Sequence, residues 1–556
     1  MDNYRALIAI VLSMAVLLIY QFVFMPASPT TTAPPPAPEP LAAAPEFGVP
    51  GEAVAPELTA PGQAPVDVAT LAARGTSREI TVETDLYTAV ISEAGGVLKS
   101  FRTKEFRDTV DPRSAAKDLV RTDQEDGLPL FFSWGVEPGR AETLHFAADQ
   151  EGRLQVNPGQ ERTLTLRAVS PLGLEIVRTY TFRDNDYRIA LAVDVHNRGE
   201  VPLQGAPYLT LVNRPFSDGG DPLEHFLFTG PTVLVDNEVN QVKVKDLAGE
   251  RAGRSFTGRV SWAGYNDSYF LTSIIPLGVE QSTAHFSSRR DDLVTTVLAS
   301  AVDIIPPQAS QRYEYLVYFG PKKLSLLNEL GHELGRSVNF GWFDFLARPT
   351  LYLLNFLHGL VGNYGIAIIL VTILIKIAFW PLTHKGLKSM KTMQKIQPKM
   401  LKLREKYKDD RQRQQQEMLK LYQTYKVNPL GGCMPMILQI PVFFALYKVL
   451  LQSIELRHAP FMLWINDLSA PDRLYIGFDI PWLGGIPVLT LLMGASMFIQ
   501  QKMTPISDPM QAKIMMFLPV VFIFLFLNFA SGLVLYWFIN NVLTIAQQYM
   551  IYRQKD

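Results

Sequence analysis

Apolar segments long enough to cross a membrane occur at both ends of this sequence. The segment Ala6–Met25 holds 20 residues without a charge, which suits one crossing of a hydrocarbon layer about 30 Å thick. Five further apolar segments occur in the second half of the chain, at about 357–382, 430–451, 484–501, 511–528 and 531–550. The sequence therefore predicts a multi-domain membrane protein with six transmembrane α-helices.

The first apolar segment, within residues 1–25, is interpreted as a retained signal-anchor. A cleaved signal peptide is the alternative, but this segment exceeds the usual length of about 7–15 residues and no small-x-small site directly follows it. Arg5 precedes the segment, and no Lys or Arg occurs from Pro26 to Ala73. Because basic residues stay on the cytoplasmic side, we expect a cytoplasmic N-terminus.

Two segments of different character separate the first span from the others. Residues 26–76 are rich in Pro and Ala, which is typical of a semi-extended linker. Residues 77–320 show short runs of alternating apolar residues bounded by Gly, Pro, Asn or Asp, as in Ile189, Leu191, Val193 and Val195. This pattern predicts an all-β domain, which the topology places outside the cytoplasm.

The segment 324–347 returns to helical spacing before the second span. One face carries the apolar residues Leu327, Leu330, Leu334 and Val338, and aromatic residues follow at Phe340, Trp342 and Phe343. Such aromatic side chains are favoured at the membrane surface. We expect an interfacial amphipathic helix here, leading into the core at 350–552.

The charges of the loops predict how the spans are oriented. Between Thr383 and Val427 there are 13 Lys or Arg residues and 4 acidic residues. Between Gln452 and Gly484 there are 2 basic residues and 4 acidic ones. The first loop is therefore expected in the cytoplasm and the second outside, with the C-terminus in the cytoplasm.

The cytoplasmic loop is predicted to form an antiparallel helical hairpin over 384–426, with Pro398 bending its first arm. Its basic, Met-bearing surface would contact a nascent chain, a ribosome or anionic lipid headgroups. In the alternative interpretation, its lysines serve only to set the orientation of the spans in the membrane, although orientation requires far fewer charges than this loop carries. The candidate contact residues are Met393, Lys395, Lys399, Met400 and Lys402.

Lys376 is the one formal charge in the apolar run Ile366–Trp380. Charges inside a membrane are costly, so they normally face a bundle interior or a wet cavity. The alternative is that the long side chain snorkels towards the cytoplasmic surface. Thr372 lies one turn earlier on the same face, and Gln439 adds polarity to the next span. Since the last five spans contain no Asp or Glu, Lys376 is expected either to lose its proton or to contact water.

Composition excludes several classes of function. The net charge of −1 excludes a globally basic nucleic-acid binder, and no specific nucleic-acid recognition is expected. The single cysteine, Cys433, excludes an intramolecular disulfide and CxxC zinc or redox sites. No GxxxxGK[ST] motif occurs, so a P-loop pump is also excluded. We expect no catalytic residue, metal or cofactor.

Between about Phe340 and Arg553 the chain carries the motifs Trp380-Pro-Leu-Thr383, Lys426-Val-Asn-Pro-Leu-Gly-Gly-Cys433, Gln439-Ile-Pro-Val-Phe443, Ala459-Pro-Phe461 with Trp464, Gln500-Gln-Lys-Met503, Asp508-Pro-Met510 and Ser531-Gly-Leu-Val-Leu-Tyr536. In their order and spacing, these motifs resemble the YidC/Oxa/Alb family of membrane protein insertases. The domain at 77–320 resembles the periplasmic domain of the Gram-negative members, a supersandwich similar to galactose mutarotases.

The resemblance implies a five-helix core around a hydrophilic groove that opens to the cytoplasm and the lipid. Lys376 stands where the family usually has Arg, and Thr372 and Trp537 match positions that line the groove or contact substrates. The family implies a non-enzymatic insertase and chaperone in the inner membrane of a Gram-negative bacterium. Its implied partners are nascent membrane proteins, the Sec translocon, the ribosome and membrane lipids.

Two other functions are weighed against insertion. An ion or solute transporter could use Lys376 as its site, but we find no inverted repeat and no carboxylate in the last five spans for coupling. A sugar-converting enzyme could reside in the β domain, by analogy with mutarotases. No pair of acid and base residues is identifiable there, and a fold does not carry a function by itself.

Overall fold

The computed structural model describes residues 77–553, apart from 112, 139–143, 172, 217–227, 248–252, 291, 409, 426–433, 479, 481–482 and 505–508. The predicted first span at 1–25 lies outside the described residues, and so does the predicted linker at 26–76. The described residues all belong to one compact unit, Thr76–Asp556.

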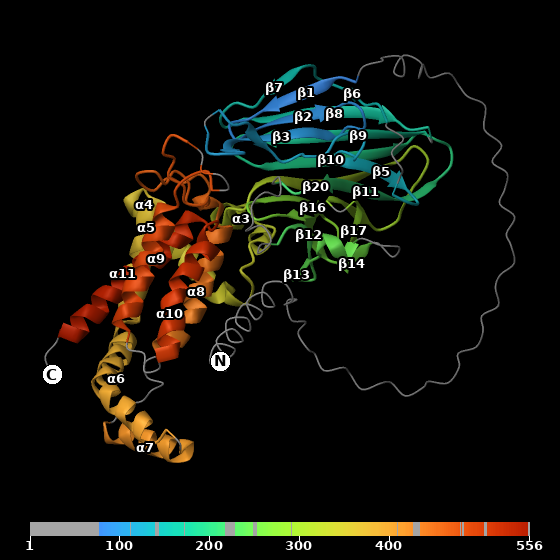
Figure 1. Cartoon of the computed structure of the whole chain (residues 1–556). Helices are drawn as coiled ribbons and strands as arrows, with labels where there is room; N and C mark the ends of the chain where they lie inside the picture. The colour runs from blue at the N-terminus through green and yellow to red at the C-terminus, as the bar shows by residue number, and fades with distance from the viewer. Residues whose placement is uncertain are drawn as a thin grey trace, which may run out of the picture. The chain divides into compact units, whose positions relative to one another are not determined.

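Strands occupy the first half of the described chain (Figure 1). In chain order they are β1 (Glu79–Glu83), β2 (Tyr87–Ser92), β3 (Leu98–Arg107), β4 (Ala116–Asp118), β5 (Phe131–Gly135), β6 (Ala147–Ala148), β7 (Arg153–Gln155), β8 (Glu161–Val169), β9 (Leu174–Arg183), β10 (Arg188–Asn197), β11 (Leu203–Asn213), β12 (Gly230–Val235), β13 (Glu238–Gln241), β14 (Arg254–Gly258), β15 (Val260–Asn266), β16 (Phe270–Leu277), β17 (Ser282–Arg290), β18 (Leu293–Ser300), β19 (Asp303–Ile305) and β20 (Ser310–Pro321).

These strands form three sheets in the described part of the chain. A five-stranded sheet has the order β4-β3-β2-β1-β7, and a nine-stranded sheet has the order β13-β12-β15-β16-β20-β10-β9-β8-β6. A six-stranded sheet has the order β14-β17-β18-β11-β19, with β5 paired to β11. Alternate residues of β10 are buried, which matches the period-2 pattern expected of a strand with one face in a core. The prediction of a β-rich domain is confirmed.

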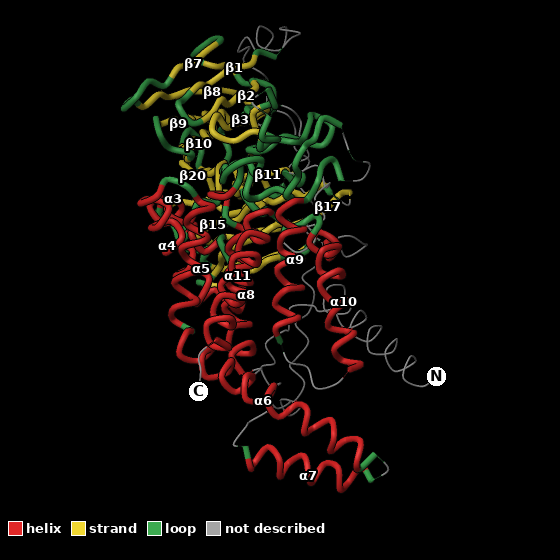
Figure 2. Tube along the Cα trace, turned by 60° about the vertical axis from the view of Figure 1, so that its left-hand side comes forward, coloured by secondary structure: helices red, strands yellow, loops and turns green. Residues whose placement is uncertain are grey.

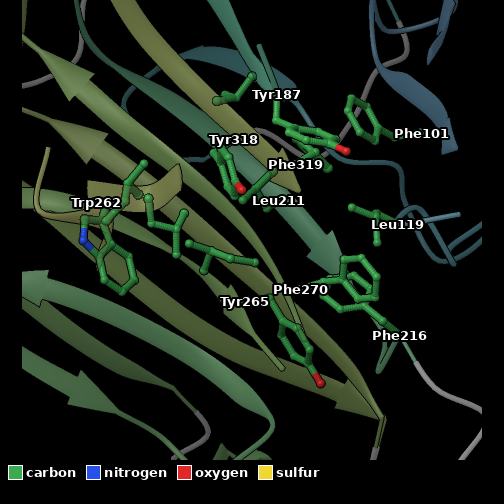
Figure 3. Packing of buried hydrophobic residues seen from close by; sticks show 14 of the residues in the cluster. Phe101, Leu119, Tyr187, Leu211, Phe216, Trp262, Tyr265, Phe270, Tyr318 and Phe319 are labelled. Atoms are coloured by element: carbon green, nitrogen blue, oxygen red, sulfur yellow. The ribbon is translucent and has the colours of Figure 1, made fainter. Parts of the chain in front are cut away.

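Contacts between the sheets make this domain a sandwich. The ring of Phe101 on β3 lies 5.4 Å from that of Phe319 on β20, and both rings appear in the packed cluster of Figure 3. The buried amide of Asn213 on β11 donates a 3.0 Å hydrogen bond to the Thr272 hydroxyl on β16. Both smaller sheets therefore pack against the nine-stranded sheet, and burial of large aromatic side chains stabilises the contact.

Helices occupy the second half of the described chain (Figure 2). They are α3 (Leu324–Leu330), α4 (Asp344–Val361), α5 (Tyr364–Ala378), α6 (Trp380–Lys406), α7 (Arg411–Thr424), α8 (Met434–Gln452), α9 (Val488–Met503), α10 (Pro509–Phe526) and α11 (Ser531–Arg553). Short 3₁₀ turns occur at η2 (Val244–Leu247), η3 (Leu334–Ser337), η4 (Gly341–Phe343) and η6 (Ile454–Leu456).

The prediction of one amphipathic helix over 324–347 is wrong. Helix α3 ends at Leu330, and the next residues, Gly331, His332 and Glu333, all have positive φ angles that interrupt a helix. The long amphipathic helix is α4, which begins at Asp344. It buries Ala347, Leu351, Leu354 and Leu357 on one face and exposes large apolar side chains on the other.

Helix α4 ends in a sharp turn that the predicted span 357–382 does not anticipate. Gly362 adopts the left-handed conformation with φ 68°, which glycine tolerates without steric cost. The side chain of Asn363 then caps α5 by accepting a hydrogen bond from the Ile366 N–H. The apolar helix that carries Lys376 therefore begins at Tyr364.

Helices α5, α8, α9, α10 and α11 correspond to the five predicted carboxy-terminal spans. Among the described residues, no single helix combines the length and apolar character of a full membrane span. Helices α5 and α6 meet those requirements as a pair, bent by 67°. Shorter apolar stretches occur at Gln439–Gln452 and Lys513–Phe526.

The hairpin predicted over 384–426 corresponds to α6 and α7, which run side by side (Figure 2). Ile396 and Met400 on α6 are buried, and Met418 and Leu421 on α7 pack against them. The heptad spacing of these apolar residues explains the pairing, because it keeps them on one face of each helix.

Candidate functional site

Helices α5 and α11 lie side by side in parallel, and this pairing builds the environment of Lys376. Gly532 near the start of α11 packs against the Ile368 side chain on α5. Further along, the Gln547 amide of α11 donates a 2.8 Å hydrogen bond to the Thr383 hydroxyl, at the start of α6. A Cβ atom at position 532 would lie 3.4 Å from the Ile368 side chain, which is an ordinary van der Waals distance, so this contact does not by itself require glycine.

Lys376 is buried between these helices, with 5% of its surface exposed. Its ammonium donates a 2.7 Å hydrogen bond to the Thr544 hydroxyl and a 3.3 Å hydrogen bond to the Asn540 side-chain carbonyl. The Thr544 hydroxyl in turn donates to the Asn540 backbone carbonyl at 2.6 Å. Two uncharged groups of α11 therefore solvate the cation of α5.

The sequence predicts that Lys376 either loses its proton or contacts water, and both possibilities stay predictions. The Lys376 side chain is buried, and its nitrogen donates hydrogen bonds to two oxygen atoms of α11. Lysine has three donor positions, and the third has no hydrogen-bond partner among the described residues. The last five apolar helices contain no Asp or Glu, so the positive charge has no carboxylate partner within them.

Thr372 lies one turn before Lys376 on α5 and is also buried. Its hydroxyl donates a 2.7 Å hydrogen bond to the Ile368 carbonyl of its own helix. Such a bond satisfies the hydroxyl inside an apolar helix without a partner from another helix. Thr372 therefore shares the face of Lys376, but it does not join the hydrogen bonds of the ammonium.

Trp537 belongs to an aromatic cluster on three helices. Its ring lies 4.9 Å from that of Phe443 on α8, and 5.4 and 4.8 Å from those of Phe522 and Phe526 on α10. Trp537 also precedes Asn540 and Thr544 by three and seven residues, so all three lie on one face of α11. The aromatic cluster and the Lys376 contacts are thus successive parts of one helix face.

Gln439 is half-buried on α8. No hydrogen bond of its side chain to Lys376 or to α11 occurs among the described residues. The structure therefore brings Lys376, Thr372 and the face of Trp537 together, and it leaves Gln439 apart from their contacts.

The five candidate residues of the hairpin divide into two groups. Met400 is buried between α6 and α7, and Met393 is partly buried against the same cluster. Lys395, Lys399 and Lys402 are exposed, and Lys399 hydrogen-bonds the Tyr425 hydroxyl of the other arm. The expectation that Met400 forms part of a contact surface is therefore wrong, because its side chain holds the hairpin together.

Sequence reasoning missed two features of the site. Thr544 was not selected, although it lies four residues after Asn540 and thus on the same helix face. Lys448 was overlooked as a second cation within a predicted span. It is half-buried on α8 and has no hydrogen-bond or ion-pair partner in the part of the chain that the structure describes. Among the described residues, no cluster of His, Cys, Asp or Glu is suited to hold a metal ion.

Comparison with known proteins identifies the two halves of the chain separately. Residues 79–353 match the family model for the YidC periplasmic domain. Residues 356–556 match the family model for the 60Kd inner membrane protein. The two models follow each other along the chain in the order of the β domain and the helices.

Similar proteins extend over almost the whole chain. A membrane protein insertase YidC from Syntrophus aciditrophicus (strain SB) is 43% identical, with 99% of each chain covered. A membrane protein insertase YidC from Geobacter metallireducens is 41% identical, covering 98% of this chain and 97% of the relative. A solved structure of an active YidC insertase with its first transmembrane domain resolved is 20% identical, covers 86% of this chain and 93% of its own, and has a TM-score of 0.36. The chain therefore belongs to the YidC family of membrane protein insertases of the inner membrane.

Proposed function

We propose that this protein inserts nascent membrane proteins into the inner membrane and chaperones them there, alone or with the Sec translocon. The observation that carries the proposal is the buried ammonium of Lys376, held between α5 and α11 by neutral oxygen atoms. Family membership supports the same conclusion, since the full-length relatives are named insertases. Insertion requires no covalent chemistry, so the proposed site contains no catalytic group.

A buried cation without a carboxylate partner is suited to a transient contact with a passing polypeptide. Its third donor position can bind an acidic side chain or a backbone carbonyl of the substrate. A charge in a low-dielectric environment interacts more strongly than one in water. We propose that helices α5, α8, α9, α10 and α11 form the core around a hydrophilic groove open to the cytoplasm. Lys376, Thr372, Gln439 and Trp537 are its proposed substrate-facing residues.

The apolar segment of the substrate supplies the driving force in this proposal. Burying apolar surface in the hydrocarbon layer is favourable by about 25 cal/mol per Å², whereas bringing a polar flanking segment into the layer is costly. Hydrogen-bonding groups on the face of α11 would lower that cost. The protein then assists insertion without an external energy source.

The proposed topology has six spans with both termini in the cytoplasm and the β domain in the periplasm. The basic loop that holds α6 and α7 and the acidic loop at 453–487 support it, because basic loops remain inside. Helix α4 takes the interfacial position, since it exposes Phe345, Phe356 and Leu360 on one face. The exposed lysines of the hairpin would contact the ribosome, nascent chains or anionic headgroups.

Insertion can be tested with the purified protein in liposomes and a small single-span substrate synthesised in vitro. We expect a protease-protected product that empty liposomes do not yield. Lys376→Ala should reduce it and Lys376→Arg should retain most of it, because charge rather than shape is required. Lys448→Ala is the matched control, since it removes another cation of the same bundle. Unchanged insertion by Lys376→Ala would contradict the proposed role of the charge, and solute uptake lost in that variant would support a transporter instead.

A further inference from the structure

The loop between α8 and α9 exposes an apolar turn at Met462 and Leu463. Their exposed fractions are 49% and 81%, and no charged residue occurs from Ala459 to Ile465. Exposed apolar groups that lie together on a surface commonly mark a contact with a protein or a membrane.

The base of this turn is held firmly. The Leu468 N–H donates to the Ala459 carbonyl at 3.0 Å and closes the loop. The Ser531 hydroxyl and the Gly532 N–H of α11 donate to the Asp467 and Leu468 carbonyls at 2.8 and 2.9 Å. The exposed turn is therefore presented by a fixed support.

The backbone at the turn adopts a conformation that is costly for its residue. Leu463 has a φ of 58°, in the left-handed region that favours glycine. Hydrogen bonds on both sides hold this conformation, from the Phe461 N–H to the Ile465 carbonyl at 3.0 Å and from the Ile465 N–H to the Met462 carbonyl at 3.1 Å. Residues held in sparsely populated backbone conformations cluster at functional sites, and the residue held here is the exposed Leu463.

Contacts with α5 place the turn beside the beginning of that helix. The Asn363 amide, which caps α5, donates to the Phe461 carbonyl at 2.9 Å. The Phe461 ring packs directly against Gly365, where a side chain would clash with it. Ile366, the first exposed apolar residue of α5, follows immediately. In the proposed topology, this is the level at which α5 enters the outer leaflet.

The exposed apolar face of α4 ends close to the start of α5, where the turn also lies. Phe345, Tyr352, Phe356 and Leu360 recur at helical spacing with exposed fractions between 49% and 70%. Leu360 lies three residues before Asn363, the residue that is bonded to the Phe461 carbonyl. The apolar turn therefore lies near the end of α4, where the exposed apolar face of that helix also ends.

We propose that the Met462–Leu463 turn inserts into the outer leaflet of the membrane and contacts the lipid chains next to the headgroups. Its absence of charge and its position at the start of α5 fit a lipid surface. The contact anchors the loop at 453–487, and through Ser531 and Gly532 it also fixes the start of α11. The proposal rests on α5 crossing the membrane, but it does not depend on insertion activity.

A fluorescent probe at the turn tests this contact. In the full chain with Cys433→Ser, which removes the only cysteine, Leu463→Cys is labelled with an NBD group and reconstituted in phosphatidylcholine–phosphatidylglycerol vesicles. Ile304→Cys is the matched control, because Ile304 is an exposed apolar residue of the β domain, with 64% exposed. We expect shallow spin-labelled lipids to quench most of the fluorescence at 463 and iodide to quench little of it. The control should show the reverse.

Two outcomes would overturn the proposal. Iodide quenching at 463 equal to that at 304 would show that the turn lies in water. Shielding of 463 from both quenchers would show that a second copy of the chain covers it.

A second variant separates membrane contact from folding. Leu463→Gly relieves the positive φ, so thermal stability should be retained while lipid quenching of a probe at Met462→Cys falls. Insertion measured in the same vesicles shows whether the proposed function holds independently.

Discussion

The ammonium of Lys376 on α5 donates a 2.7 Å hydrogen bond to the hydroxyl of Thr544 on α11. The two residues are 168 positions apart in the sequence. The bond ties the two helices together at the charge and keeps the charge hydrogen-bonded without a carboxylate. It therefore accounts for how a lysine is retained in an apolar helix.

Removing the Thr544 hydroxyl should weaken this tie. Thr544→Val keeps the side-chain shape but leaves the ammonium one acceptor short, which we expect to destabilise the protein by about 1–3 kcal/mol. Thermal unfolding in detergent micelles measures the change, and the yield of protected product should fall as well. Thr544→Ser restores the acceptor and should recover both, so a serine variant as impaired as the valine variant would contradict the role of the hydrogen bond.

The β domain contains a buried cation that is held in a similar way. The Arg178 guanidinium on β9 donates to the Gly95 carbonyl at 3.0 Å and to the Leu130 carbonyl at 2.6 Å. Arg178→Leu leaves both carbonyls without that donor, and each unsatisfied carbonyl should lower the free energy of unfolding by about 1–3 kcal/mol. We expect a correspondingly lower unfolding temperature of the full chain. Arg183→Ala on the same strand is the control, because exposed ion pairs contribute at most about 1 kcal/mol. Equal effects of the two variants would contradict this account.

Stability should depend on pH through Glu455, just after α8. Burial raises the pKa of this carboxyl above its ordinary value, against the opposing hydrogen bond from Asn355. The folded state thus binds the proton more tightly than the unfolded state, and stability is lost as the pH rises through the raised pKa. Glu455→Gln has no carboxyl to ionise at this position, so the variant does not lose this stability. The difference in stability between the variant and the wild type should therefore grow as the pH rises above about 4.3, the ordinary pKa of Glu. Unfolding temperatures in micelles across pH measure it, and a constant difference would contradict the prediction.

The hairpin should respond differently to substitutions at its two kinds of site. Met400→Ala removes a buried side chain between α6 and α7 and should destabilise the hairpin by about 2 kcal/mol or more. Faster hydrogen exchange of α7 would report that loss. Lys402→Gln should leave exchange unchanged and weaken binding to anionic vesicles by about 1 kcal/mol. The prediction fails if Lys402→Gln accelerates exchange as much as Met400→Ala does.

Several features of this protein follow from local sequence alone. Alternation along β10 and repeated turn residues predicted the β domain, because one buried face imposes a period of two. Apolar run length predicted helices α5, α8, α9, α10 and α11, and heptad spacing predicted the pairing of α6 with α7. The insertase motifs predicted the family. These features depend on residues close together in the chain.

The break before α5 was missed for a local reason that could have been recognised. The segment Gly362-Asn363 combines a residue that tolerates the left-handed conformation with a preferred helix cap. Hydropathy continues across it, so apolar run length alone joined the end of α4 to α5. The amphipathic helix was accordingly placed too early, at 324–347.

The sequence by itself determined that a β domain precedes a set of apolar helices, where basic charge gathers and that Lys376 is the one charge in its apolar run. Only the tertiary structure decided what that charge contacts and which way Met400 and Leu463 face. The physical reason is that hydropathy and periodicity report each residue's neighbours along the chain. The partner of a buried polar group depends instead on how helices pack, and the packing of α5 against α11 joins Lys376 to Thr544.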